Sequence, residues 1–592
     1  MSGTEQSPTT DPSPLGGTAR AVLRGAGIIL IITVVARIAG FVRYLVFGAS
    51  VGAGDVGTAY STANLLPNVL FEVVAGGALA AVVVPLVAGL VPERRDRDGH
   101  QLPVHGTETA IPPPGDVADG RDRADRIISA LLTWTLLVTI GLAAAVIALS
   151  QPLTDLLLGS EDTSGPGLEL GARLLRIFAL QLPLYGIAVI LGAYLQARKR
   201  FVWPALMPLL SSLVVMASYR VYAALVPPVA TASTIDAPAI GWLGWGTTAG
   251  VAVMCLPVLV ASLRAGLRLR PTLRMPAGVG RQALALGAAG IGAVGAQQAV
   301  LGVVLLLAMG AGGTGTLPVF QYAQAVYLLP FAVLVVPLTT AVFPHLAELR
   351  LVGDPVAFAR VSAASVRTVI LVAVTGSAML VAGAPAVEQF FRLIDRSGAA
   401  GVGSTSAALA LGLAGYAVAT QCTRVLSAAL RARDALLVGS VGWGAAGALI
   451  LVVTLPSPGR SAAEAATAFG VCIAIGMSLS ALVGLGRIAD VVEPGGDGHL
   501  LRRTSLLGPV ALLAGAVPGL LLAKWLVTTS TGVTGSILSG IAAGLVAAAL
   551  SGAVLALTDL PLLRRLPSLL RRRRHASAAT ATAGETTVGE TA

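Results

Sequence analysis

The chain has 592 residues, of which 55% are hydrophobic and only 12% are charged. A soluble protein carries roughly 25% charged residues, so this composition excludes an ordinary soluble enzyme or binding domain. The net charge of +11 does not indicate nucleic-acid binding, because the basic residues gather in short segments between apolar runs and mark one membrane face.

Apolar runs of about 18 or more residues recur along the chain, and each is long enough to cross a bilayer as a helix. They predict an all-α polytopic membrane protein with about fourteen transmembrane helices. In chain order the predicted spans are Gly25–Phe47, Thr58–Val91, Ile127–Ser150, Leu170–Ala197, Phe201–Val226, Ala239–Leu263, Gln282–Met309, Leu317–Phe343, Val361–Ala382, Ser404–Leu430, Ala435–Leu455, Ala463–Leu485, Ser505–Val527 and Gly532–Leu557.

The basic residues are distributed unevenly between the two sides of these spans. If the N-terminus is cytoplasmic, 30 of the 40 Lys and Arg residues fall in cytoplasmic segments. Only Arg392, Arg396 and Arg460 fall in outer loops. Since cytoplasmic loops carry the excess of positive charge, we expect both termini to be cytoplasmic.

Weak internal similarity indicates two repeats of six spans. Leu65–Pro67 matches Leu328–Pro330, and LQARKR (Leu195–Arg200) matches LRARDA (Leu430–Ala435). Six is an even number, so the repeats share one topology, as in transporters built from two rocking lobes. The predicted organisation is a disordered cytoplasmic N-terminus (1–19), an N-lobe of spans one to six (20–263), a cytoplasmic linker (264–281), a C-lobe of spans seven to twelve (282–485), a C-terminal helix pair (486–557) and a basic, polar cytoplasmic tail (558–592).

The sequence offers no motif for catalysis or for a cofactor. GAGGTG (Gly310–Gly315) fits a dinucleotide pattern, but it lies between two spans and has no βαβ context. There is no P-loop and no H-E-x-x-H. Cys255, Cys422 and Cys472 fall inside predicted spans and resemble small apolar residues more than a disulfide or metal framework. We expect no enzyme activity, no cofactor and no metal.

Charged residues inside the first two spans are the strongest site candidates. A charge at mid-bilayer costs at least about 2.5–3.5 kcal/mol on insertion scales and usually faces a cavity or a partner. Arg37 lies about 12 residues, or roughly 18 Å, into its span. Arg43 lies nearer the outer interface, where snorkelling is an alternative, and Gly40 between them permits close packing or a bend. Glu72 serves either as a counter-ion, for example to Arg43, or as a functional carboxylate.

Uncharged polar residues in the spans extend this predicted polar path. Such a residue is more often an interhelical hydrogen-bonding partner than a ligand contact, although two adjacent glutamines in span seven are more suggestive. The predicted substrate-binding residues are Arg37, Gly40, Arg43, Asn64, Asn68, Glu72, Gln297, Gln298 and Gln324.

These segments resemble the MurJ/MviN lipid II flippase family. The resemblance is carried by ARIAGFVRYLVFG and LLPNVLFEVVAGGALAAVVVPL, by GAYLQARKRFVWPALMP (Gly192–Pro208) and by YAQAVYLLPFAVLVVPLTTAVFPHLAEL (Tyr322–Leu349). It implies a V-shaped, two-lobe transporter of the bacterial cytoplasmic membrane with a central cationic cavity. It also implies outward flipping of the undecaprenyl-pyrophosphate-linked peptidoglycan precursor by alternating access, with a groove for the lipid tail formed by the last two spans. The partners implied are that precursor, the lipid bilayer, and cell-wall synthesis or division proteins.

Arg37, Gly40 and Arg43 match the family's Arg-x-x-Gly-x-x-Arg pattern, but other charged positions of the family are changed. Uncharged or acidic residues replace them at Tyr44, Thr58, Phe71, Glu72, Gly76, Gln324 and Ala325. The remaining chemistry still suits a pyrophosphate, because guanidinium groups bind phosphate oxygens through paired N–H donors. The inside-negative potential favours outward movement of an anion by about 2.3 kcal/mol per charge per 100 mV.

Two alternatives stay open on the sequence alone. One is an exporter of drugs or of another lipid-linked oligosaccharide, although a drug antiporter would be expected to use membrane acids and only Glu72 lies clearly inside a span. The other is a non-transporting membrane scaffold. Loss of a flippase would accumulate lipid-linked precursor inside the cell and cause lysis, whereas loss of a drug exporter would change only drug sensitivity.

Overall fold

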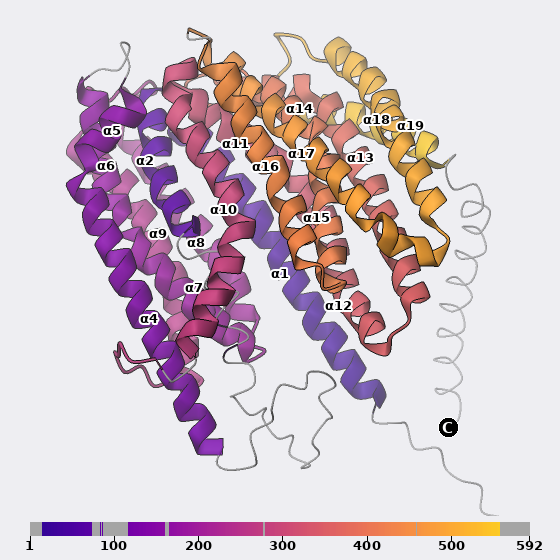
Figure 1. The fold of residues 1–592 in the computed structure, drawn as a ribbon. Helices are drawn as coiled ribbons and strands as arrows, with labels where there is room; N and C mark the ends of the chain where they lie inside the picture. Colours follow the sequence, from indigo (N-terminus) through magenta and orange to yellow (C-terminus); the bar gives the residue numbers. More distant parts are fainter. Residues whose placement is uncertain are drawn as a thin grey trace, which may run out of the picture. The chain divides into compact units, whose positions relative to one another are not determined.

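The computed structural model describes residues 15–73, 83, 86, 117–159, 165–275, 279–456 and 459–556. Helices joined by short connections make up this part of the chain, and it contains no strand (Figure 1). Residues 15–19, inside the predicted disordered N-terminus, already belong to the first helix. The rest of that segment and the predicted tail at 558–592 lie outside the described residues.

The chain divides into two compact units. The first contains residues up to Pro318 together with Asp395–Ser397, and the second contains Val319–Ile394 and the residues from Gly398 onward. The helices of the first unit are α1 (Leu15–Ser50), α2 (Asp55–Phe71), α4 (Val117–Ala148), α5 (Ser150–Leu158), α6 (Gly165–Ala179), α7 (Gln181–Ala197), α8 (Val202–Leu225), α9 (Ala237–Arg264) and α10 (Val279–Gly312).

The second unit begins within α11 and runs to the end of the described chain. Its elements are α11 (Thr316–Pro330), the π-helical turn η2 (Phe331–Val335), α12 (Val336–Val352), α13 (Pro355–Ile394), α14 (Val402–Leu411), α15 (Leu413–Ala428), α16 (Ala432–Thr454), α17 (Ala462–Val492), the 3₁₀ turn η3 (Glu493–Gly495), α18 (Gly498–Leu526) and α19 (Val533–Ala556). Helix α10, which opens the predicted C-lobe, lies with the first unit. The predicted lobes follow the sequence repeat rather than these units, and they stay a prediction.

Twelve helical segments of the described chain are long and apolar enough to cross a membrane. The pair α14 and α15, which is bent by 41°, makes a thirteenth if it is counted as one span. Helix α2 has only 17 described residues, and most of the remainder of the predicted second span lies outside the described part. The all-helical, multi-pass class is therefore confirmed, whereas the count of fourteen is not.

The predicted eighth span is not one continuous α-helix. Its α-helical halves, α11 and α12, are separated by the π-helical turn η2. Pro330 precedes this turn and Pro337 follows it, and neither can supply an amide N–H to the helical hydrogen-bond ladder. A π-helical turn is a usual local adjustment inside an α-helix, and it recurs at functional sites.

Orientation in the membrane remains a prediction, and it can be tested on two exposed positions. We expect a cysteine at Ser233, between α8 and α9, to react with a membrane-impermeant maleimide in intact cells. A cysteine at Arg433, in the first turn of α16, should react only after permeabilisation. The three native cysteines are buried and should add little background. The opposite labelling pattern would mean that the positive-inside assignment is inverted.

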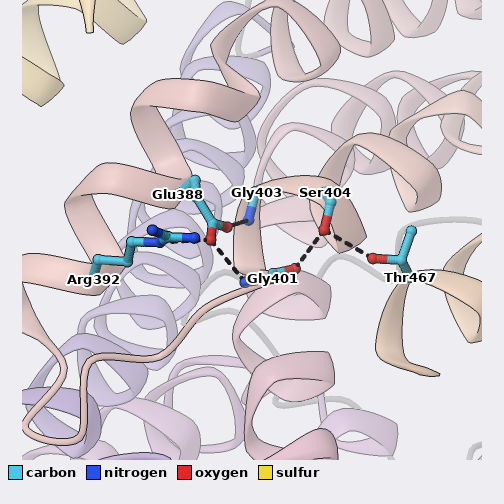
Figure 2. A network of polar contacts seen from close by, with 6 residues as sticks. All are labelled: Glu388, Arg392, Gly401, Gly403, Ser404 and Thr467. Carbon is cyan, nitrogen blue, oxygen red and sulfur yellow. Dashed lines mark hydrogen bonds and ion pairs between the residues drawn. The ribbon is translucent and has the colours of Figure 1, made fainter. Parts of the chain in front are cut away.

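In the second unit, the carboxylate of Glu388 in α13 holds the first turn of α14. Its two oxygens accept hydrogen bonds from the backbone N–H groups of Gly401 and Gly403, both at 2.8 Å, and the Arg392 Nε donates at 2.9 Å. The first amides of a helix have no partner within the helix, and a negative charge there is favourable. Figure 2 shows this network, which continues through Ser404 to Thr467 of α17.

We expect Glu388→Gln to lower the free energy of unfolding by about 1–3 kcal/mol, because a neutral amide cannot accept from both backbone donors with the strength of a carboxylate. The matched control is Arg392→Gln, which removes only an exposed ion pair and should cost less than about 1 kcal/mol. Unfolding in detergent, followed by circular dichroism, measures both variants. Equal stability of the two would show that the carboxylate does not hold α14.

Candidate functional site

Helix α1 carries the two predicted arginines, and it packs against α8 within the first unit. The Arg37 side chain is exposed and the Arg43 side chain is partly buried. A Cβ added at Gly40 would meet no atom within 4 Å, so this glycine is not required for close helix packing within the described residues. Six residues turn the helix by about 600°, which leaves the two arginines roughly 120° apart around its axis.

Neither arginine forms an ion pair with an acidic side chain in the part of the chain that the structure describes. The Tyr44 ring lies beside Arg43, with its centroid 5.5 Å from the guanidinium carbon. A guanidinium over an aromatic face keeps its positive charge while losing part of its water shell. Both cations are therefore free to meet an anion that is not part of the described chain.

A cluster of aromatic and hydroxyl groups lies within electrostatic range of Arg43. The Tyr60 hydroxyl lies 2.8 Å from the Tyr219 hydroxyl and 3.0 Å from the Thr247 hydroxyl, and these three side chains are buried. The Tyr60 ring also packs edge-on against Phe178 at 5.3 Å. Helices α2, α8 and α9 are thus joined through side-chain hydroxyls, with no carboxylate in the contact.

A second polar chain lies on α7. The Gln181 Nε2 donates to the Thr248 hydroxyl at 3.1 Å, and the Tyr185 hydroxyl donates to the Gln181 Oε1 at the same distance. The Tyr185 ring packs on Phe71, at the end of α2, with centroids 5.0 Å apart. These contacts place neutral hydrogen-bonding groups, rather than acids, beside the predicted path.

On α2, the predicted residues Asn64, Asn68 and Glu72 are spaced four apart and share one face of the helix. The Asn68 Nδ2 donates to the Asn64 carbonyl at 2.9 Å and to its Oδ1 at 3.1 Å. Glu72 lies one turn after Asn68, is partly buried, and is the C-cap residue of α2. It forms no ion pair among the described residues, so the predicted interpretation of Glu72 as the partner of Arg43 is not borne out by the structure.

The glutamines divide between the two units. Gln297 and Gln298 lie on α10, which packs against α2, and the Gln298 side chain is buried. Gln324 lies on α11 in the second unit and is partly buried. Helices α1, α2 and α10 therefore bring eight of the nine predicted residues into the first unit.

Sequence reasoning missed Arg424, which lies on α15 of the second unit. Its side chain is partly buried and donates a long hydrogen bond of 3.5 Å to the Thr339 carbonyl. One turn earlier, the buried Gln421 donates to the Ser365 hydroxyl at 2.8 Å and leaves its Oε1 without a partner. The signal was present in the sequence, because Arg424 falls inside the predicted tenth span.

Comparison with known proteins identifies what this arrangement is similar to. The model of the family described as lipid II flippase MurJ matches residues 47–542. The probable lipid II flippase MurJ of Rhizobium meliloti is 26% identical over 369 residues, covering 61% of each chain. The corresponding protein of Synechocystis sp. is 26% identical over 274 residues, covering 45% of each chain. These alignments thus span less than two thirds of the relatives' lengths.

Solved structures show the same fold at low sequence identity. The lipid II flippase MurJ in an inward closed conformation gives a TM-score of 0.63 at 16% identity, covering 88% of this chain and 97% of that one. An inward-facing multidrug resistance MATE family transporter of the MOP superfamily gives 0.58 at 12% identity, covering 79% and 96%.

Proposed function

Because the chain belongs to the MurJ family of lipid II flippases, we propose that it moves lipid II from the inner to the outer leaflet of a bacterial cytoplasmic membrane. Lipid II is the undecaprenyl-pyrophosphate-linked precursor of peptidoglycan. The family is a transporter family rather than an enzyme class. Alternating access, cytoplasmic termini and contacts with cell-wall synthesis or division proteins are part of the same proposal.

The observation that carries this proposal is the pair of cations on α1 that have no acidic partner in the described part of the chain. Arg37 and Arg43 form no ion pair among the described residues, and the groups within electrostatic range of Arg43 are the phenols of Tyr44, Tyr60, Tyr185 and Tyr219. A charge in a span is costly unless it meets a partner. A pyrophosphate is a partner of suitable chemistry, since each guanidinium can donate two parallel N–H bonds to phosphate oxygens.

Neutral polar groups would complete the path for the headgroup. We assign the Asn64 and Asn68 amides of α2, Gln297 and Gln298 of α10, and Gln324 of α11 to hydrogen bonds with the sugars and peptide. Within the second unit, Arg424 of α15 is a further candidate cation. Glu72 is assigned to the peptide amino group rather than to Arg43, because the structure gives it no basic partner among the described residues.

The same charges argue against a cationic drug as the substrate, although MATE transporters share the fold. A lipophilic cation would be repelled by two arginines that form no ion pair with any described residue, and the described face of α2 offers it only Glu72. The energy source that fits an anionic substrate is the membrane potential. It favours outward movement of negative charge by about 2.3 kcal/mol per charge per 100 mV.

Binding to the purified protein tests this choice of substrate. A soluble short-chain analogue of lipid II should raise the unfolding temperature, because a ligand at a hundredfold excess over its Kd stabilises the native state by about 2.7 kcal/mol. The lipophilic cation ethidium at equal concentration is the control and should have no effect. Stabilisation by ethidium but not by the lipid II analogue would favour the drug exporter.

A further inference from the structure

The segment between α9 and α10, which the sequence presents as a linker, is built into the first unit. We name Leu267–Arg274 the linker arm. Its backbone N–H groups at Arg268, Arg270 and Thr272 donate to side-chain oxygens of α4 at 3.3, 3.0 and 3.2 Å. The acceptors on α4 are Asp125, Ser129 and Thr133.

The match between arm and helix follows from two periodicities. The three acceptors are four residues apart on α4, so they form a stripe with a spacing of about 6 Å. Alternate N–H groups of an extended chain point the same way, with a spacing of about 6.6 Å. The arm is therefore held by its backbone, and the Trp134 indole N–H fixes its far end by donating to the Leu273 carbonyl at 3.2 Å.

Over Leu267–Arg270, alternation decides which side chains face outward, whereas Leu273 near the far end of the arm is exposed. Leu267 is buried and Leu269 packs on the same core cluster, which includes Ile128 of α4 and Leu191 of α7. The intervening side chains are exposed at Arg268 and Arg270, and so is the side chain of Arg274. None of these three guanidinium groups forms an ion pair in the described part of the chain.

A second basic segment meets the arm at its start. The Arg198 guanidinium donates to the Ala265 carbonyl and, at 2.9 Å, to the Tyr194 hydroxyl, which joins the end of α7 to the end of α9. Arg200 is exposed beside it. Trp134, which contacts the arm, and Trp203, three residues after Arg200, have much of their area exposed, at 47% and 41%.

We propose that Arg200, Arg268, Arg270 and Arg274, here named the basic collar, bind the anionic headgroups of phospholipids. The arm lies along the first turns of the span formed by α4, and exposed tryptophans mark the level of the headgroups. Apolar rings and guanidinium groups that form no ion pair within the described ranges fit a ligand with a phosphate head and an acyl tail better than a soluble acidic protein. This site is independent of the transported substrate, so its failure would leave the proposed function untouched.

Trp134 supplies a built-in probe. In a variant that keeps Trp134 and replaces the other five tryptophans with phenylalanine, quenching by phosphatidylglycerol with brominated acyl chains reports lipid enrichment at the arm. Each arginine near an anionic surface favours binding by about fivefold. We therefore expect at least about tenfold selectivity over brominated phosphatidylcholine in nanodiscs at low salt. The triple variant R268Q/R270Q/R274Q keeps only Arg200 of the collar and should reduce this selectivity to about fivefold or less.

Two control variants distinguish the effect of losing charge on lipid selectivity from the effect of disturbing the structure of the arm. R431Q/R487Q also removes exposed arginines, but these are ion-paired with Asp490 and Asp434, so selectivity should be unchanged. Thr133→Val releases one backbone bond of the arm without removing charge, and it should lower selectivity partially. Full selectivity in the triple variant would overturn the proposal. Millimolar inorganic phosphate, added at constant ionic strength, should leave the selectivity unchanged. If phosphate abolished it, the site would bind free anions and the proposal would be overturned.

Discussion

Arg37→Ala is expected to abolish lipid II transport while leaving the protein inserted and folded. The side chain is exposed in the first unit and has no acidic partner among the described residues, so its removal leaves no buried acid unpaired. Arg37→Lys should restore transport poorly, because an ammonium group cannot reproduce the planar two-point contact of a guanidinium with phosphate. Growth of a depletion strain carrying each variant measures transport.

The neighbouring residue on α1 provides the control for this prediction. Ile38 is also exposed, at 46%, and Ile38→Ala should support normal growth. Protein level and melting temperature in detergent must be measured on the same strains. Normal growth with Arg37→Ala would exclude the substrate role, and lost growth with equally lost protein would assign Arg37 to the structure instead.

Arg43→Ala should slow transport by about 10- to 100-fold, the loss expected when a charged hydrogen-bonding partner worth about 1.5–3 kcal/mol is removed. Arg43→Lys should retain more activity than Arg37→Lys. This site lies nearer the predicted interface, and an ammonium group also binds the face of Tyr44. Flipping of fluorescent lipid II in proteoliposomes measures the rates.

The control here is Tyr44→Phe, which keeps the ring beside Arg43 and should leave the rate within a few-fold of the parent. If Arg43→Lys is as slow as Arg43→Ala, then charge alone does not explain the role of Arg43. A parental rate for Arg43→Ala would remove it from the headgroup site.

The class of fold could be predicted from the sequence because span length and hydropathy depend on local composition alone. The resemblance to the lipid II flippases, confirmed by the match over residues 47–542, rested on a few motifs such as the arginine pair of α1. The depth of Arg37 and Arg43 along their span stays a prediction, because it depends on the rise per residue and on where the span begins. Side-chain contacts between helices cannot be predicted in this way. Of the two roles left open for Glu72, the ion pair with Arg43 is not formed among the described residues.

Other features depend on contacts between distant segments. The tyrosines around Arg43 carry no charge and gave no signal, although Tyr60 reaches Tyr219 and Thr247 across three helices. The linker arm does have a signal in the sequence, because LRLRPTLR largely alternates leucine and arginine with the period of an extended strand. Its docking site on α4 could not be found from that pattern, since side-chain oxygens every fourth residue are common on helices.

The central claim is that this protein delivers lipid II to the outer leaflet. The most direct measurement is the accessibility of lipid II to an externally added lipid II-cleaving enzyme in cells depleted of the protein. We predict that the cleavable fraction falls while total lipid II rises, and that the parent chain restores the cleavable fraction whereas Arg37→Ala does not. An unchanged cleavable fraction in depleted cells that lack any other lipid II flippase would contradict the claim.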